Sequence, residues 1–176
     1  MRVIAGSARG FKLLSVPGDS TRPITDRAKE ALFSILGDWI YDTRVLDLFG
    51  GTGSISYELA SRGTKDITII EKDQAMYEFI KRTSKELKLE NFKLLRMDVF
   101  KFILQCEEKF DLIFAGPPYA LTNIDDLPEL VFKKQLLNKK GWFILEHIPK
   151  NDYQKSPFYA TERNYGTTIF SIFIQP

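Results

Sequence analysis

A regular alternation of short apolar runs with amphipathic segments, from residue 44 onward, constrains the fold of this chain more than any other feature. The apolar runs are expected to be strands, and they cover 45–49, 67–70, 92–97, 110–115 and 142–145. The segments between them are expected to be helices, at 54–61, 74–89, 100–106 and 127–137. Strands that alternate with helices form a parallel, doubly wound sheet with helices on both faces. The sequence therefore predicts an α/β fold.

Two further segments flank this alternation. Residues 1–20 hold two strand-like runs around Gly6–Gly10, which predicts a small β-hairpin extension before a main domain at 21–176. A helix is expected next, because apolar residues recur at helical spacing from Ala28 to Trp39, with Thr25 as the N-cap. The tail at 159–174 has two strand-like runs around a turn at 164–166, which predicts a C-terminal antiparallel hairpin.

The composition is that of an ordinary soluble globular protein. The 176 residues are 44% apolar and 27% charged, and no apolar run approaches the ~18 residues that a membrane-spanning helix needs. Small and charged residues follow Gly6, so no signal peptide is expected. Cys106 is the single cysteine and cannot form an internal disulfide. We therefore expect a reduced, cytoplasmic protein.

The charge is unevenly distributed along the chain. The whole sequence has a net charge of only +2, but its first 29 residues hold more bases (Arg2, Arg9, Lys12, Arg22, Arg27, Lys29) than acids (Asp19, Asp26). A basic front on a nearly neutral body is a candidate contact for a polyanion such as a nucleic acid. A basic arm that serves only solubility is the alternative, and the charges alone do not separate the two.

A glycine turn at 47–53, Asp-Leu-Phe-Gly-Gly-Thr-Gly, joins the first expected strand to the next helix. Glycines there let the backbone approach a ligand, and the helix N-terminus behind them offers free N–H groups. A dinucleotide-binding turn needs a third glycine where this chain has Ser56. An acid just before the glycines, here Asp47, suits the ammonium group of a methionine-derived nucleoside instead. A sulfonium nucleoside is therefore favoured over a dinucleotide.

Polar residues stand at the ends of the other expected strands: Glu71, Asp98, the turn at 116–119 and Glu146. In such sheets, ligands bind outside the carboxyl ends of the strands. Glu71 can accept both hydroxyls of a ribose, and Asp98 can accept a hydrogen bond from the exocyclic amine of adenine. Each acid alone could be a solvated charge, but together with the glycine turn they predict a nucleoside site.

The turn at 116–119, Gly-Pro-Pro-Tyr, ends the fourth expected strand. Prolines fix φ and remove backbone donors, so the carbonyls near Pro117 and Pro118 become oriented acceptors. Tyr119 offers a flat ring on which a nucleobase can stack. The combination suits a planar exocyclic amine, and a rigid loop with a core tyrosine is the alternative. We assign no chemistry to His147, to Cys106 or to any metal.

The sequence resembles the bacterial small-subunit ribosomal RNA guanine-N2 methyltransferases (RsmD-type), which have the Rossmann-like fold of S-adenosylmethionine enzymes. The resemblance covers nearly the whole chain and is carried by the order and spacing of its motifs: residues 1–4 with Gly6 and 9–10, 21–27 with 30–33, 47–53, 61–63, Glu71, Asp98, 110–114, 117–119 and 165–166. It implies S-adenosylmethionine as the cofactor and small-subunit ribosomal RNA, free or in an assembled particle, as the partner.

The resemblance also implies roles for individual residues. Asp47, Phe49, Gly51, Gly53, Glu71 and Asp98 would surround the cofactor, and Arg22 to Thr25 would fold over its methionine end. Arg2, Arg9 and Lys12 of the hairpin would contact RNA, and Gly116, Pro117, Pro118 and Tyr119 would form the catalytic turn. The expected reaction moves a methyl group to the exocyclic N2 of a guanine that is unstacked beside Tyr119, without a metal or a covalent enzyme intermediate.

One departure from the family pattern concerns the catalytic turn, which begins with Asp in the family and with Gly116 here. The missing side chain would accept a hydrogen bond from the attacking amine and help to remove its proton. Loss of such a group typically costs about 10²–10⁴-fold in rate. Three interpretations stay open: a weakened enzyme, a relative that only binds RNA and cofactor, and an altered residue in the source sequence. A dinucleotide-dependent oxidoreductase is the remaining, less favoured alternative.

Overall fold

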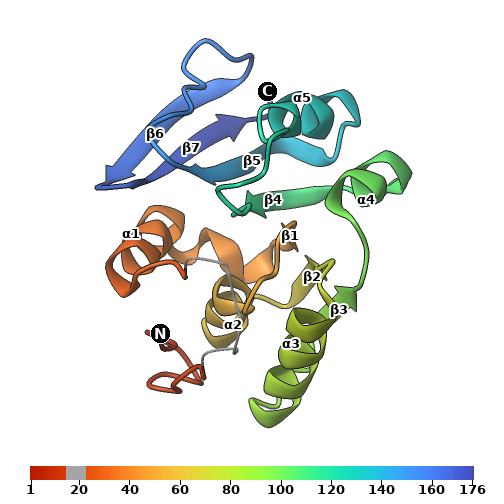
Figure 1. The fold of residues 1–176 in the computed structure, drawn as a ribbon. Coiled ribbons are helices and arrows are strands. Elements are labelled where there is room, and N and C mark those ends of the chain that lie inside the picture. Colours follow the sequence, from red (N-terminus) through yellow and green to blue (C-terminus); the bar gives the residue numbers. More distant parts are fainter. Residues whose placement is uncertain (15–22) are drawn as a thin grey trace.

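The computed structural model describes residues 1–14 and 23–176 (Figure 1). Its sheet has seven strands in the order β3-β2-β1-β4-β5-β7-β6. The strands are β1 (Arg44–Asp47), β2 (Asp66–Ile70), β3 (Phe92–Leu95), β4 (Phe110–Ala115), β5 (Leu137–His147), β6 (Tyr159–Tyr165) and β7 (Thr168–Ile174). Strands β1 to β5 pair in parallel, while β7 lies antiparallel between β5 and β6. The predicted α/β fold, mostly parallel with a C-terminal antiparallel hairpin, is confirmed.

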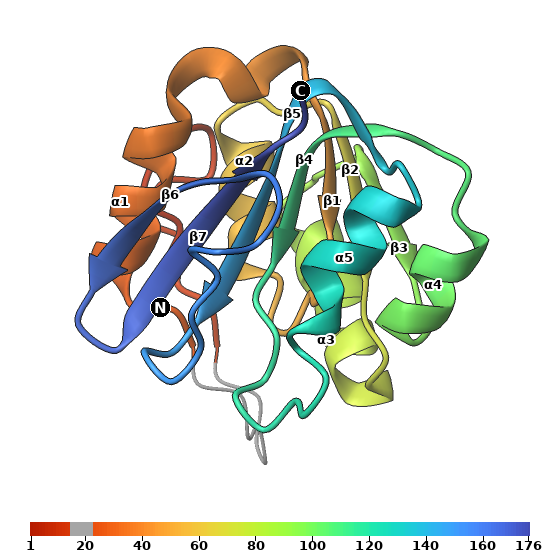
Figure 2. The ribbon, with the colours of Figure 1, turned by 90° about the horizontal axis from the view of Figure 1, so that it is seen from above.

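Helices cover both faces of the sheet (Figures 1 and 2). Helices α1 (Asp26–Leu36), α2 (Ser54–Ser61) and α3 (Gln74–Glu86) lie on one face, and α4 (Val99–Gln105) and α5 (Asp126–Lys133) lie on the other. Each face has its own hydrophobic core. Side chains alternate along a strand, so Val45 belongs to the first core and its neighbour Leu46 to the second. This double covering explains why the central strands β1, β2 and β4 carry buried apolar residues on both faces.

The boundary between α5 and β5 differs from the sequence-based expectation. The predicted helix at 127–137 ends at Lys133, and β5 begins at Leu137 instead of Trp142. Gln135 has a φ of 53°, which interrupts the helical backbone, and Leu137 then pairs with Phe110 of β4. An apolar run alone does not separate a helix end from a buried strand.

Helix α1 begins as predicted and ends earlier. The Thr25 side chain accepts a hydrogen bond from the Ala28 N–H at 3.1 Å, which confirms the N-cap. Gly37, with a φ of 56°, ends the α-helix, and a short 3₁₀ segment (Gly37–Asp42) follows. Trp39 therefore leaves the expected apolar stripe, remains 40% exposed and packs on Trp142 with 5.3 Å between the ring centroids.

The N-terminal segment forms a tight turn instead of two regular strands. Within residues 1–14, its strand pairing is a single bridge between Arg2 and Lys12, and the Val3 N–H donates to the Phe11 carbonyl at 2.9 Å. The segment is attached to α2, since the Ser7 N–H donates to the carbonyl of Ser61 at 2.8 Å. The predicted end of this extension at residue 20, like Arg22, falls outside the described residues, so the proposed division into domains stays a prediction.

Candidate active site at the carboxyl ends of the strands

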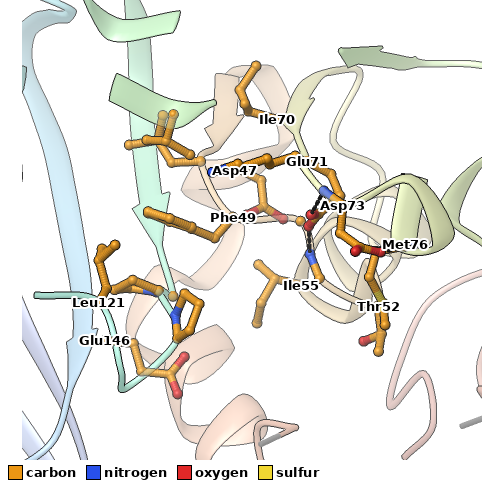
Figure 3. Close-up of a pocket in the computed structure, with 18 of the residues that line it drawn as sticks. Asp47, Phe49, Thr52, Ile55, Ile70, Glu71, Asp73, Met76, Leu121 and Glu146 are labelled. Carbon is orange, nitrogen blue, oxygen red and sulfur yellow. Dashed lines mark hydrogen bonds between the residues drawn. The ribbon is translucent and has the colours of Figure 1, made fainter. Parts of the chain in front are cut away.

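A pocket of about 940 Å³ lies where the central parallel strands end (Figure 3). This is the position expected for a ligand site in a doubly wound sheet, and the volume falls within the usual ~300–1,000 Å³ of small-molecule sites. The pocket brings together nine of the predicted site residues: Asp47, Phe49, Gly51, Glu71, Asp98, Gly116, Pro117, Pro118 and Tyr119.

The glycine turn between β1 and α2 forms one wall of the pocket. Gly51 has a φ of 56°, and a Cβ added to it would meet nothing within 4 Å, so its backbone faces open space. Gly53 has a φ of 84° and begins α2, but it is buried, and a Cβ there would lie 2.4 Å from the Tyr57 ring. Gly51 therefore offers its backbone to a ligand, whereas Gly53 is required by packing and does not line the pocket.

Asp47, the last residue of β1, is 1% exposed. Its Oδ2 accepts a hydrogen bond from the Ser56 hydroxyl at 2.7 Å, and its Oδ1 has no partner among the residues that the structure describes. The pKa of Asp47 is raised to about 7, mainly by burial and also by the charges of Glu71 and Glu146, against the hydrogen bond from Ser56. A buried carboxylate oxygen without a partner suits a cation or a bound water molecule.

Glu71 follows β2 and holds the glycine turn in place. Its two oxygens accept the N–H of Gly51 at 2.6 Å and that of Asp73 at 2.8 Å (Figure 3). Burial raises the pKa of this carboxyl group, while the two backbone donors oppose the shift. Because each oxygen can accept more than one hydrogen bond, these contacts leave acceptor capacity for ribose hydroxyls.

Asp98 has a structural task that the sequence reasoning missed. It is the N-cap of α4, and its Oδ1 accepts the N–H of Phe100 at 2.9 Å and that of Lys101 at 3.1 Å. Its Oδ2 lies 3.7 Å from the ammonium of Lys72. The sequence does contain a signal for this role, because Asp directly before an amphipathic segment is a common helix N-cap. The expected contact with adenine stays a prediction.

The turn at 116–119 forms the opposite wall. Pro117 is buried, and the side chain of Tyr119 is 39% exposed at the pocket rim. A Cβ added to Gly116 would lie 3.0 Å from Oε2 of Glu146 and 3.1 Å from the ring of Phe114. Glu146 is the pocket residue whose role the sequence reasoning left unassigned, although its place at a strand end marked it.

The predicted residues before α1 are distributed differently. Thr25 caps the helix and does not line the pocket, whereas its neighbours Pro23 and Ile24 do. The predicted RNA-contacting residues Arg2, Arg9 and Lys12 are exposed on the N-terminal segment. That segment reaches the pocket rim, where the sulfur of Met1 lies 3.9 Å from the hydroxyl of Thr52.

The burial of Lys29 lowers the exposed positive charge of the N-terminal region. Lys29 is one of the six bases of the N-terminal region, but its side chain is fully buried and its ammonium lies 3.5 Å from Oε2 of Glu58. Arg2 is partly neutralised too, because its guanidinium lies 3.3 Å from Asp26. The exposed positive charge of the described N-terminal segment is therefore smaller than the formal count.

The described residues contain neither a candidate metal centre nor a helix suited to span a membrane. Within 1–14 and 23–176, no group of three His, Cys, Asp or Glu side chains is arranged to hold a metal ion. No helix in these ranges has the length and apolarity needed to cross a membrane. His147 is buried, and its ring nitrogens lie 2.7 Å from the Ser171 hydroxyl and 2.9 Å from the Ile148 carbonyl, which is a structural arrangement.

The sheet order, the antiparallel β7 between β5 and β6, and the acid-preceded glycine turn define a Rossmann-like methyltransferase fold. The family model described as "Conserved hypothetical protein 95" matches residues 1–174, and the chain belongs to this family. It is similar to the ribosomal RNA small subunit methyltransferase D of Haemophilus influenzae, with 34% identity over 150 residues that cover 83% of this chain and 78% of the relative.

Solved structures share this fold. A hypothetical protein of Thermus thermophilus superposes with a TM-score of 0.86 at 28% identity, covering 98% of both chains. The 16S rRNA N2 methyltransferase RsmC of Thermus thermophilus, in complex with AdoMet and guanosine, has a TM-score of 0.74 at 24% identity, covering 92% of this chain and 46% of that one. At that identity, the second likeness shows the fold alone.

Proposed function

We propose that this chain transfers a methyl group from S-adenosylmethionine to the exocyclic N2 of a guanine in small-subunit ribosomal RNA. The observation that carries the proposal is that a single pocket joins the acid-lined glycine turn of 47–53 to the Pro-Pro-Tyr turn of 117–119. One end of the pocket suits the cofactor and the other suits a planar base. The family and its methyltransferase relatives support the same reaction.

The cofactor end is built from groups that fit a methionine-derived nucleoside. The Oδ1 atom of Asp47, which has no partner in the described part of the chain, suits an ammonium or its bound water, and the open face of Gly51 allows close approach. Glu71 and Asp98 would bind the ribose and the adenine. When bound, S-adenosylmethionine supplies an electrophilic methyl group on a sulfonium.

The base end would hold a guanine that has left the RNA stack. The carbonyls near Pro117 and Pro118 accept the hydrogens of the exocyclic amine, and the ring of Tyr119 stacks on the base. Unstacking a base costs a few kcal/mol, which contacts to the base and the backbone must offset. Arg2, Arg9 and Lys12, which are exposed on the N-terminal segment, would contact RNA phosphates.

The proposal is tested by single-turnover transfer of labelled methyl from S-adenosylmethionine to small-subunit ribosomal RNA. Naked RNA and assembled small subunits are compared, and the digested nucleosides are identified by mass spectrometry. N2-methylguanosine in one of the two substrates is the expected product. Label on another nucleoside, or on neither substrate, would overturn the proposal.

Gly116 favours one second candidate, a relative that binds cofactor and RNA without catalysis. It predicts calorimetric binding of S-adenosylhomocysteine together with no detectable methyl transfer on either substrate. The dinucleotide-dependent oxidoreductase is not supported. Ser56 stands at the third glycine position and bonds Asp47, and the relatives are methyltransferases. Binding of NAD more tightly than S-adenosylhomocysteine would revive it.

A further inference from the structure

We propose that Glu146 accepts the hydrogen bond and then the proton of the attacking amine, in place of the side chain that Gly116 lacks. The inference rests on the proposed methyl transfer and names a catalytic residue for it. Glu146 comes from β5, the strand beside the one that ends in the Gly-Pro-Pro-Tyr turn.

The pairing of β4 with β5 brings the two positions together. Ala115 pairs with Leu145, so Gly116 and Glu146 are the next residues on adjacent parallel strands. A Cβ on Gly116 would lie only 3.0 Å from Oε2 of Glu146. The carboxylate of Glu146 therefore lies against the position where a side chain at residue 116 would begin.

Glu146 also lies at the end of the pocket proposed to hold the base. It lines the same pocket as Pro117, Pro118 and Tyr119, the turn proposed to hold the base. Figure 3 shows it beside Leu121, on the side of the pocket away from Glu71 and Asp73. Because Glu71 belongs to the proposed cofactor end, Glu146 faces the proposed base end.

The carboxylate of Glu146 is available as an acceptor. The other carboxylates that line the pocket each accept a hydrogen bond, Asp47 from Ser56 and the rest from backbone N–H groups. Among residues 1–14 and 23–176, none donates a hydrogen bond to Glu146 or pairs with it as a cation. The carboxylate of Glu146, which is half-buried at the pocket wall, therefore keeps its acceptor capacity for a bound ligand.

The proton affinity of Glu146 suits this task. Burial raises its pKa to about 7. A general base is most effective when its pKa lies near the working pH, because it is then deprotonated often enough and still basic enough to take a proton. An exposed glutamate, with a pKa of about 4.3, would be a much weaker base.

The proposed step balances as follows. The amine nitrogen donates one hydrogen bond to Oε2 of Glu146, which concentrates its lone pair. That lone pair forms the new N–C bond, while the S–C bond breaks and its electron pair stays on sulfur. The nitrogen then passes one proton to Glu146, and the carboxylic acid releases it to solvent. The products are the N2-methylated guanine, S-adenosylhomocysteine and one proton.

The first test is Glu146→Gln, which preserves size and removes the proton acceptor. The single-turnover rate at saturating cofactor is expected to fall about 10²-fold or more, while the affinity for S-adenosylhomocysteine by calorimetry stays within about twofold. Glu129→Gln, exposed on α5 on the other face of the sheet, is the matched control and keeps the wild-type rate.

The second test returns the missing side chain. Gly116→Asp alone is expected to give no gain in rate, because its Cβ meets Glu146 and two carboxylates would share one site. Gly116→Asp combined with Glu146→Gln is expected to recover at least tenfold over Glu146→Gln. A merely structural role for Glu146 predicts no such rescue. A large gain from Gly116→Asp alone would overturn the proposal.

A third test follows the titration of Glu146 by infrared spectroscopy, which does not depend on activity, and compares it with the pH dependence of the transfer rate. Infrared spectra should show a carboxyl group that titrates near pH 7 and is absent in Glu146→Gln, and the transfer rate should rise with pH through the same range. Two charged groups of the described residues bear on this titration. Asp47 on β1 interacts electrostatically with Glu146, and Arg163 on β6 pairs with Phe170, the residue of β7 that pairs with Glu146. Asp47 also titrates near pH 7, so the difference between wild type and Glu146→Gln isolates Glu146.

The outcomes separate the inference from the proposed function. Transfer by the wild type with an unchanged rate in Glu146→Gln overturns the role of Glu146 alone. A wild type that transfers no methyl group to either RNA substrate overturns the proposed function and this inference with it. Transfer that is lost in Glu146→Gln and recovered in the double variant supports both.

Discussion

The ammonium of Lys29 on α1 lies 3.5 Å from Oε2 of Glu58 on α2, and both side chains are fully buried. Lys29 also donates to the hydroxyl of Ser54 at 3.2 Å and to the carbonyl of Arg2, while Glu58 accepts the N–H of Ile4 at 2.8 Å. This pair therefore attaches the N-terminal segment to the helices beside the glycine turn. Its charges serve the fold and are not available to bind RNA.

Lys29→Met is expected to destabilise the protein by about 3–5 kcal/mol, because it leaves the Glu58 carboxylate buried without its cation. Denaturant unfolding followed by circular dichroism measures the effect. Arg2→Ala is the control, since the side chains of Arg2 and Asp26 are 63% and 44% exposed. Exposed pairs contribute about 0–1 kcal/mol. Equal effects of the two substitutions would contradict a special role for the buried pair.

Gly6→Ala is expected to loosen the N-terminal turn from α2. Gly6 has a φ of 82°, and a Cβ there would lie 1.8 Å from the backbone oxygen of Ser61. Gly10 is the control: it has a similar φ of 86°, but a Cβ there would meet no atom within 4 Å. Gly10→Ala therefore introduces the backbone strain, about 1–2 kcal/mol, without the steric clash. The difference in unfolding free energy between the two variants measures the clash, and indistinguishable stabilities would show that Gly6 does not pack against Ser61.

Stability is expected to fall as the pH rises from about 4 to about 7, in part because of Asp47. The pKa of Asp47 is raised to about 7 in the fold, so the folded state binds this proton more tightly than the unfolded chain does. The free energy of unfolding therefore decreases wherever the unfolded carboxyl has ionised and the folded one has not. Asp47→Asn should flatten this slope and stabilise the protein by a few kcal/mol at pH 8, with little effect at pH 4. A slope that the substitution leaves unchanged would refute the assignment.

Tyr119→Ala is expected to weaken the binding of the target guanine with little change in folding, because the ring is 39% exposed at the pocket rim. Loss of one base-stacking ring costs about 1–3 kcal/mol, which corresponds to about a 5–150-fold increase in KM for RNA. Tyr119→Phe retains the stacking face and should behave like the wild type. Steady-state transfer kinetics for the three proteins give the answer, and a loss in Tyr119→Phe as large as in Tyr119→Ala would point to the hydroxyl instead.

Arg9→Gln and Lys12→Gln are each expected to weaken binding to RNA of any nucleotide sequence. Each should also reduce the slope of log affinity against log salt concentration by about 1. Both side chains are exposed on the N-terminal segment. Lys133→Gln, exposed on α5 on the far face, serves as the control and should leave both quantities unchanged. Titrations of RNA at several salt concentrations test this, and an effect of Lys133 equal to that of Arg9 would argue against a defined RNA face.

The sequence alone determined the layers of the fold and the edge at which the site lies. Apolar periodicity and capping are local properties, so the strand–helix alternation, the Thr25 cap and the strand-end positions of Asp47 and Glu71 were all predictable. The acids come together because parallel strands end at one edge, which is a consequence of the fold class.

The tertiary structure decided what depends on which segments become neighbours. Lys29 looks like a surface base in the sequence, and only the approach of Glu58 from α2 makes it a buried ion pair. Glu146 looks like any acid at a strand end, and only the register of β4 with β5 places its carboxylate 3.0 Å from the missing side chain of Gly116. Residues about 30 positions apart become neighbours only when the chain folds, because helix packing and strand register bring them together. Such contacts leave no periodic pattern in the sequence.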